Sequence, residues 1–316
     1  MTSEPHDEGL GIPPAEDATE SGVDARTRVA RLVEQALNQR PPRSQADKSV
    51  PKNQAAKAAK AQIAELLKES KALDGQIADK GLVAIAVSAY FRGGRPSAAD
   101  QAAIRRIAEI QTEAARIRLD ALVGWAVLDV DLEAMTAKAA AREAVASFPF
   151  AHYEYSFSLG QTSRSFAWWR NQAVEWPTST ARYWLGGQFR AALPERVTSH
   201  LALATVHSPT LSGTVTSQDA IYLPAAADIG RRGLPAADPA AGPDAGDAHL
   251  KTWGVLDGRK NTFWLRETGR GVVRYADAAG PSESYHSAFY TDAIQPIINL
   301  DLTTFRRLRG RSPRTA

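Results

Sequence analysis

The histidines are the first residues to consider for metal binding or acid–base chemistry. The chain has six of them: His6, His152, His200, His207, His249 and His286. They are scattered, and His200 and His207 have no carboxylate near them at the spacing of a metal site. Solvent-exposed histidines are therefore the favoured interpretation, and no metal site is predicted.

A second group with possible chemistry is the acidic alternation of Asp129, Asp131 and Glu133. Alternating carboxylates can bind calcium when a loop also supplies a glycine and further spaced oxygens. This segment has neither, so an acidic turn at the end of a strand is the favoured interpretation.

Several reaction classes are excluded by residues that the chain lacks. There is no cysteine, which excludes disulfides, thiolate metal sites and cysteine nucleophiles. The motifs G-x-x-x-x-G-K-[ST], H-E-x-x-H and G-x-S-x-G do not occur. Tryptophans that could line a ligand pocket are more often part of a core; they are Trp168, Trp169, Trp176 and Trp184. We expect neither catalysis nor a cofactor.

Charge is distributed unevenly along the chain. Residues 1–24 carry seven acids and no Lys or Arg, giving −7. Residues 25–120 carry 18 Lys or Arg against 10 Asp or Glu, giving +8, and residues 121–316 carry 20 against 18, giving +2. The basic surplus of residues 25–120 indicates a contact with a polyanion.

The same basic part has the periodicity of helices. Apolar residues at helical spacing predict helices over Arg26 to Asn38, Lys57 to Lys71 and Ser97 to Leu119. In the second of these, Ile63, Leu66 and Leu67 are expected inward, with the lysines outward. Residues 39–55 have the composition of a linker.

Between the last two helices, Leu73 to Ser97 predicts two short helices around a turn. Asp74 is placed to cap the first, in which Ile77 and Ala78 are buried, and Gly81 to make the turn. The second fits Ala84 to Phe91, and Ser97 with Asp100 forms a capping box for the next helix.

This stretch resembles the helix-turn-helix of the lambda-repressor-like (XRE-type) family, whose members commonly read G-L-S-K-S-T-V-S-R-Y-L-S-G-x-R-x-P-S. The residues in register are Gly81, Leu82, Val87, Ser88, Tyr90, Gly93, Arg95, Pro96 and Ser97. The resemblance covers Lys57 to roughly Arg118 and implies an all-α DNA-binding domain.

The family's base-reading positions on the second helix are apolar here. They are occupied by Val83, Ala84, Ala86 and Ala89, which can touch a thymine methyl but cannot hydrogen-bond to a base. Phosphate contacts remain for Lys68, Lys71, Lys80, Arg92 and Arg95, with Arg105 and Arg106 further along. We expect weak, salt-sensitive binding of double-stranded DNA. The alternative is that this face binds a protein partner or a second copy of the chain.

At Leu122 the pattern changes from helical to strand-like. L-V-G-W-A-V-L-D-V-D predicts a buried strand. Strand-like segments, aromatic residues and turns follow, with one clear helix over Ser179 to Phe189. Residues 230–249 have the Pro, Gly and Ala content of a loop.

Two segments of this half stand out, V-E-W-P-T-S-T-A-R-Y-W-L-G-G-Q-F and F-W-L-R-E-T-G followed by I-Q-P-I-I-N-L-D. They resemble W-x-x-S-x-L-R-x-W-L-N-x-x-F and W-W-L-R-S-P-G with V-R-P-A-I-x-L-D, signatures of a bacterial domain of unknown function related to C-type-lectin-like and formylglycine-generating-enzyme-like folds. The matching residues are Trp176, Ser179, Arg182, Trp184, Leu185, Phe189, Trp264, Leu265, Arg266, Gly269, Pro296, Ile298, Leu300 and Asp301. Two further segments, T-S-Q-D-A-I-Y-L-P and G-W-A-V-L-D-V, resemble strands of the same domain.

The resemblance covers residues 122–303 and implies a fold without an activity, since the formylglycine-generating class depends on cysteines. The motif residues have the character of a core. On a strand, Trp264 and Leu265 face opposite sides, and Arg266 lies on the side of Trp264. A buried Arg266 needs a carboxylate partner, for which Asp301 and Asp219 are the candidates; such an ion pair is favoured over ligand recognition.

The sequence thus predicts two domains, an all-α helix-turn-helix bundle at residues 57–120 and an α+β C-type-lectin-like domain at 121–304. A disordered acidic tail (1–24), a helix and linker (25–56) and a basic tail (305–316) complete the chain. The expected function is a DNA-associated regulator whose second domain recognises a ligand or partner. The alternative is a non-enzymatic protein-interaction module of a bacterial conflict or effector system. Without a signal peptide or a long apolar run, a cytoplasmic protein with no membrane partner is expected.

Overall fold

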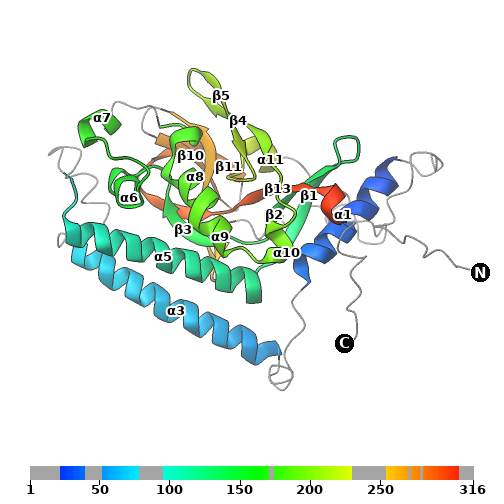
Figure 1. Ribbon diagram of the computed structural model, residues 1–316, viewed down its shortest axis with the longest axis horizontal. Helices are drawn as coiled ribbons and strands as arrows, with labels where there is room; N and C mark the ends of the chain where they lie inside the picture. The colour runs from blue at the N-terminus through cyan, green and yellow to red at the C-terminus, as the bar shows by residue number, and fades with distance from the viewer. Residues whose placement is uncertain are drawn as a thin grey trace, which may run out of the picture.

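The computed structural model describes residues 22–39, 52–77, 95–170, 174–229, 254–269, 272–277 and 280–305. Helices come first and a strand-rich region follows (Figure 1). The expected order of a helical part before a sheet-containing part is therefore confirmed.

The first helix, α1, spans Gly22–Asn38 and confirms the helix predicted over Arg26 to Asn38. Its buried side chains are those of Val29, Ala30, Val33 and Leu37. Residues 22–24, which were assigned to the acidic tail, are helical, and residues 1–21 lie outside the described part of the chain.

The second helix, α3, spans Lys52–Gln76 without a break. It confirms the helix over Lys57 to Lys71, but the prediction that Asp74 caps a separate short helix is wrong, because Asp74 lies inside α3. A helix that continues through Asp74 keeps the backbone hydrogen bonds that a new start would leave unmade, which offsets the cost of about 1 kcal/mol for Gly75 inside a helix. The predicted burial of Ile77 is confirmed, at 1% exposure. The rest of the predicted helix-turn-helix, residues 78–94, lies outside the described residues.

The third helix, α5, spans Ala98–Ala121 and begins at the predicted capping box. The N–H of Asp100 donates to Ser97 Oγ at 3.1 Å, and the N–H of Ser97 donates to Asp100 Oδ2 at 3.3 Å. In Figure 1, α3 and α5 run side by side beneath the sheets.

Helix α5 is buried on two sides. Ile104, Ile107 and Ala108 belong to the main core, which extends from Val29 of α1 to Phe305. A second, smaller cluster lies between α3 and α5 and contains Ala59, Ile63, Ala114 and Ile117. The domain boundary expected at residue 120 falls at the end of α5, yet α5 and the sheets contribute to one core.

Arg118 secures the last turn of α5 to the strand-rich region. Its guanidinium donates to both carboxylate oxygens of Asp257, at 2.9 and 2.6 Å, and to the carbonyl of Val145 at 2.7 Å. The side chain is 1% exposed, and its charge is stable there because it is fully paired.

The first sheet is antiparallel and has four strands. Their order is β1 (Trp125–Asp131), β2 (Thr136–Ala141), β13 (Ile297–Asp301) and β6 (Ile221–Tyr222). Strand β1 confirms the strand predicted after Leu122. The acidic turn is confirmed too, because Asp131 Oδ1 accepts from the N–H groups of Glu133 and Ala134, at 3.0 and 2.8 Å.

The second sheet packs beside the first and has β9 at its centre. Its main path runs β11 (Gly280–Ser287), β10 (Val272–Asp277), β9 (Phe263–Thr268), β12 (Thr291–Ile294) and β3 (Ala146–Pro149). Strand β4 (Ala204–Thr210) also pairs with β9 and forms a hairpin with β5 (Gly213–Asp219). Strands β7 (Val255–Leu256) and β8 (Arg259–Lys260) form a separate small hairpin.

Short helical turns connect these strands. They are α6 (Tyr153–Ser158), α7 (Phe166–Arg170), η2 (Trp176–Thr178), α8 (Thr180–Trp184), η3 (Leu185–Phe189), α9 (Arg190–Ala192), α10 (Glu195–Thr198), α11 (Ala226–Ile229) and η6 (Leu302–Phe305). The helix predicted over Ser179 to Phe189 is confirmed as α8 followed by the wider turn η3, with Ser179 Oγ capping its start. Trp184 and Leu185 are fully buried, as expected.

The buried arginine of β9 has a partner that the sequence analysis did not name. Arg266 Nη1 bonds Asp228 Oδ2 at 2.6 Å and the carbonyl of Leu223 at 2.7 Å. The predicted partners, Asp301 and Asp219, are therefore wrong, because the turn before α11 places Asp228 closer. The expectation of a structural ion pair is itself confirmed.

Asp219 instead joins the first motif to strand β5. Its carboxylate accepts from Arg182 Nε at 2.7 Å, from the indole N–H of Trp176 at 2.9 Å and from Ser217 Oγ at 2.5 Å. Asp219 is only 8% exposed, so these three donors replace its hydration.

We predict that Asp219→Ala lowers the free energy of unfolding by about 3 kcal/mol, because it leaves the buried Trp176 N–H and the Arg182 charge without their acceptor. Urea denaturation measures the change. Glu133→Ala removes an exposed carboxylate and should change stability by less than about 0.5 kcal/mol. Equal effects of the two substitutions would contradict a stabilising role of the Asp219 contacts.

Candidate functional site

Four lysines of α3 share one solvent-exposed face of the helix, here called the lysine face: Lys57, Lys60, Lys68 and Lys71. With 100° per residue, they fall within a sector of about 80°, away from the buried side of Ile63. The Lys68 side chain is 80% exposed and lies 4.0 Å from Glu65, a contact that contributes little in water. The lysine face therefore presents a row of solvated positive charges.

Lys60 is close enough to the strand-rich region for its charge to act on Glu143. Burial raises the pKa of Glu143, which follows β2, and the charge of Lys60 acts in the opposite direction with a smaller effect. The row is thus held on a helix that packs on the body of the protein.

The structure places three of the seven predicted DNA-contacting residues. Lys68 and Lys71 are exposed on α3, and Arg95 is exposed before α5, with its guanidinium 5.4 Å from the ring centre of Phe157. The other four lie outside the described residues: Lys80, Ala84, Ala89 and Arg92.

Lys57 and Lys60 were expected outward but were not assigned as contacts. At 100° per residue they lie on the same side of the helix as Lys68 and Lys71, and this spacing in the sequence could have assigned them as phosphate contacts. Arg106 of α5, by contrast, forms an ion pair with Glu69 of α3, in which its Nε donates to Glu69 Oε1 at 2.7 Å. This bond raises the pKa of Arg106 and lowers that of Glu69.

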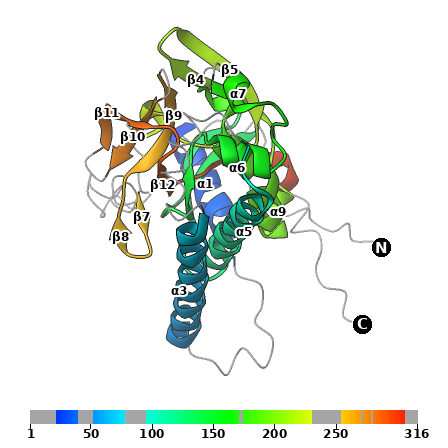
Figure 2. The same ribbon diagram turned by 90° about the vertical axis from the view of Figure 1, so that its left-hand side faces the viewer.

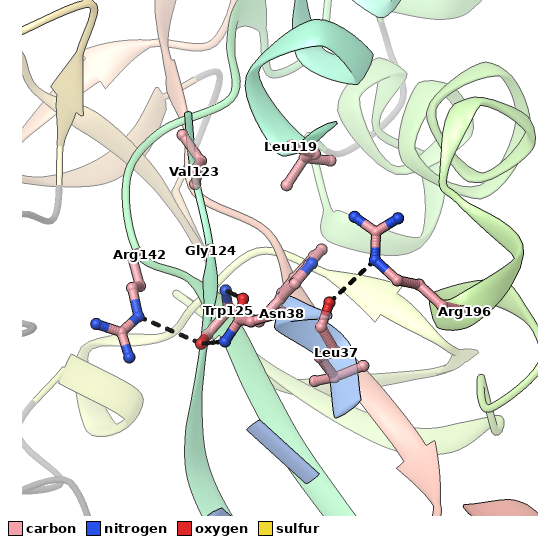
Figure 3. A pocket seen from close by; sticks show the side chains of 8 residues that line it. All are labelled: Leu37, Asn38, Leu119, Val123, Gly124, Trp125, Arg142 and Arg196. Carbon is pink, nitrogen blue, oxygen red and sulfur yellow. Dashed lines mark hydrogen bonds between the residues drawn. The ribbon is translucent and has the colours of Figure 1, made fainter. Parts of the chain in front are cut away.

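A second candidate site is a pocket of about 290 Å³ at the junction of α1, α5 and β1 (Figure 3). Its lining residues are Leu37, Asn38, Leu119, Val123, Gly124, Trp125, Arg142 and Arg196. The volume is at the lower end of what a small-molecule site needs.

The polar groups of this pocket bond one another. The side-chain amide of Asn38 donates to the Trp125 carbonyl at 2.8 Å and accepts from the Trp125 N–H at 2.7 Å. Arg142 bonds the same carbonyl and pairs with Glu34, and Arg196 Nε donates to the Leu37 carbonyl at 3.2 Å. These contacts hold the end of α1 against the sheet, so the polar groups of the pocket have a structural role.

The contact between Asn38 and Trp125 requires a glycine at position 124. A Cβ at position 124 would lie 2.8 Å from Asn38 Oδ1, closer than real Cβ contacts allow. We predict that Gly124→Ala lowers the free energy of unfolding by about 1–3 kcal/mol, because Asn38 must give up its paired bonds with Trp125. The matched control is Gly75→Ala in α3, where an added Cβ meets nothing within 4 Å and the helix should gain up to about 1 kcal/mol. Thermal or urea unfolding that shows no loss for Gly124→Ala would contradict the role of Gly124.

The histidines were expected to be exposed to solvent. Among the described ones, this is correct for His207 and wrong for His152, His200 and His286. His152 is 1% exposed and its Nδ1 lies 3.1 Å from Glu154 Oε2. His286 Nδ1 lies 2.7 Å from Asp292 Oδ2, and its ring stacks on Tyr275 at 3.8 Å between centroids. Both carboxylates are near their histidines in the sequence, and Asp292 follows His286 by 6 residues.

His200 is buried at 1% exposure beneath Phe305, at the end of η6. Its ring stacks on Phe305 at 3.7 Å, and its Nδ1 lies 2.6 Å from Thr304 Oγ1. Burial lowers the pKa of His200, and the charge of Asp301 offsets only part of this effect.

We predict that His200 makes the protein less stable as the pH falls. The native state holds the imidazole neutral, whereas the unfolded chain takes up a proton below about pH 6.5, so stability is complete above that pH and declines below it. The slope for one group is at most about 1.4 kcal/mol per pH unit. Urea denaturation at pH 8 and pH 5 should show a smaller pH dependence for His200→Gln than for the wild type. The exposed His207→Gln variant should behave as the wild type does, and an unchanged slope in His200→Gln would disprove the assignment.

Within the described ranges, no three His, Asp or Glu side chains are grouped so as to hold a metal ion. None of the helices in these ranges combines the length and the apolar character that crossing a bilayer requires. Comparisons of the chain with family models, with curated proteins and with solved structures give no match.

Proposed function

We propose that the protein is a DNA-associated regulator that contacts double-stranded DNA through the lysine face of α3. The observation that carries the proposal is the common orientation of Lys57, Lys60, Lys68 and Lys71 on one exposed face. Phosphate oxygens are the ligands that such a row of flexible cations serves best.

The dimensions of the lysine face agree with a phosphate backbone. From Lys57 to Lys71 the helix rises roughly 21 Å, the length of about six base pairs of duplex. Four lysines over that length can neutralise several successive phosphates without reading a base. The proposed binding is therefore salt-sensitive and has little sequence preference.

The finer fold assignments belong to the same proposal. The helix-turn-helix of the lambda-repressor-like type remains a prediction, supported by the capping box at Ser97 and by the helices on either side of residues 78–94. The C-type-lectin-like module also remains a prediction, supported by the burial of the motif residues Trp176, Trp184 and Trp264. In this proposal the second module recognises a ligand or partner of the regulator.

The test is a fluorescence-anisotropy titration of the full chain with random-sequence duplex at 50 and 200 mM salt. Replacing all four lysines of the lysine face by glutamine should weaken binding at low salt. It should also reduce the slope of log K against log salt by up to about 3.6, which is about 0.9 for each lost phosphate contact.

A charge-matched control separates local contact from overall charge. It carries glutamine at four other exposed basic positions, Arg164, Arg190, Arg259 and Lys260. We expect it to bind nearly as the wild type does. Equal losses in the two quadruple variants, or no binding by the wild type at low salt, would disprove the DNA contact on α3.

The second candidate is a non-enzymatic protein-interaction module of a bacterial conflict or effector system. It is favoured by the continuity of α3 through Asp74, which removes one short helix of the expected DNA-reading unit. In that case the same titration shows no duplex binding at low salt, while the chain remains folded by circular dichroism.

A further inference from the structure

Strand β5 forms an open edge of the second sheet. Within the described residues it pairs with β4 alone. Figure 1 and Figure 2 both show the β4–β5 hairpin projecting from the body of the protein. An open edge exposes backbone donors and acceptors that another strand can use.

Two other edge strands carry features that discourage strand pairing. Strand β11 contains Pro281, and β1 contains Asp129 and Asp131. In β5, by contrast, the residues before Asp219 read G-T-V-T-S-Q. The sequence has no Asp, Glu, Lys or Arg between Arg196 and Asp219. Charges and prolines are the usual protection of an edge, so β5 is an edge left available.

The position of a proline shows which backbone groups of β5 face outward. Pro209 lies opposite Thr214 in the hairpin. Because Pro209 has no N–H, this pair cannot be one that exchanges two hydrogen bonds. Such pairs alternate along an antiparallel ladder, so the N–H and C=O groups of Thr214, Thr216 and Gln218 point away from β4. The carbonyl of Gln218, at the end nearest the body of the protein, also accepts from Arg182 Nη2 at 3.4 Å.

We propose that β5 pairs with β5 of a second copy of the chain, antiparallel about a two-fold axis at Thr216. This register places Thr216 opposite Thr216, Val215 opposite Ser217, and Thr214 opposite Gln218 of the other copy. Each of Thr214, Thr216 and Gln218 then lies opposite a residue of the other copy whose N–H and C=O groups also point outward, as backbone hydrogen bonding between the strands requires. The two hairpins form one continuous sheet across the axis.

The chemistry of the edge favours a second copy over a charged partner. The one charged residue of β5, Asp219, is buried and paired with Arg182, and no like charges meet across the two-fold axis. Threonine pairs on facing strands are favourable, and a two-fold interface is the commonest way in which identical chains associate. A seven-residue strand pair buries less area than a standard interface, so the dimer is concentration-dependent.

This inference is independent of the proposed DNA contact, because β5 lies on a different part of the molecule from α3. The absence of native cysteine allows a direct test by cross-linking. In a hydrogen-bonded antiparallel pair the Cα atoms are about 5.5 Å apart, which is within disulfide range. Full-length Thr216→Cys should therefore form a disulfide-linked dimer under mild oxidation, reversed by reductant.

The matched control is Thr205→Cys, on the same exposed side of the hairpin but on β4. It should cross-link at least tenfold more slowly than Thr216→Cys. Equal rates for the two variants, or no dimer from Thr216→Cys, would overturn the proposal.

Light scattering over a range of concentrations tests the dimer without a covalent bond. The wild type should be dimeric at high concentration and Thr216→Lys monomeric, because two like charges then face each other at the axis. Thr205→Lys adds the same charge off the edge and should remain dimeric. A monomeric wild type at every concentration, or an unaltered dimer in Thr216→Lys, refutes the pairing; circular dichroism confirms that each variant is folded.

Discussion

Helix α5 is apolar on two sides, and most of the architecture follows from covering both of them. One side, with Ile104 and Ile107, is covered by the sheets and their connecting turns. The other side, with Ala114 and Ile117, is covered by Ala59 and Ile63 of α3. A helix buried in this way joins the helical part of the chain to the sheets in one core. Because α3 covers the second side of α5, α3 forms the outer layer. The side of α3 that faces away from α5 is exposed to solvent and carries the lysines.

The helical part of the fold was largely predictable from periodicity, because one amphipathic face suffices to place a helix. The capping box of Ser97 and Asp100 was predictable for the same reason, since its contacts are local. Asp74 shows the limit of this reasoning. A good capping residue does not start a helix where the preceding helix can continue without breaking its backbone hydrogen bonds.

Contacts between distant residues were the least predictable. The buried state of Arg266 followed from its strand, yet its partner proved to be Asp228, whose position depends on the turn before α11. The same applies to His200, which is enclosed by Phe305 more than a hundred residues later in the chain. Of the candidate site, the outward lysines were predictable from the helical period. The pocket at the end of α1 was not, because it exists only where α1, α5 and β1 meet.

The bond between Asn38 and Trp125 also has a consequence for the order of synthesis. The two residues are 87 positions apart. During translation, at about 5–20 residues per second, α1 therefore waits roughly 4–17 s before the strand it docks on has been made. The sheet behind that strand includes β13, near the end of the chain, which pairs with β2. Helix α1 is thus the first described element to leave the ribosome but one of the last to find its complete surroundings, and its apolar face needs protection in the interval.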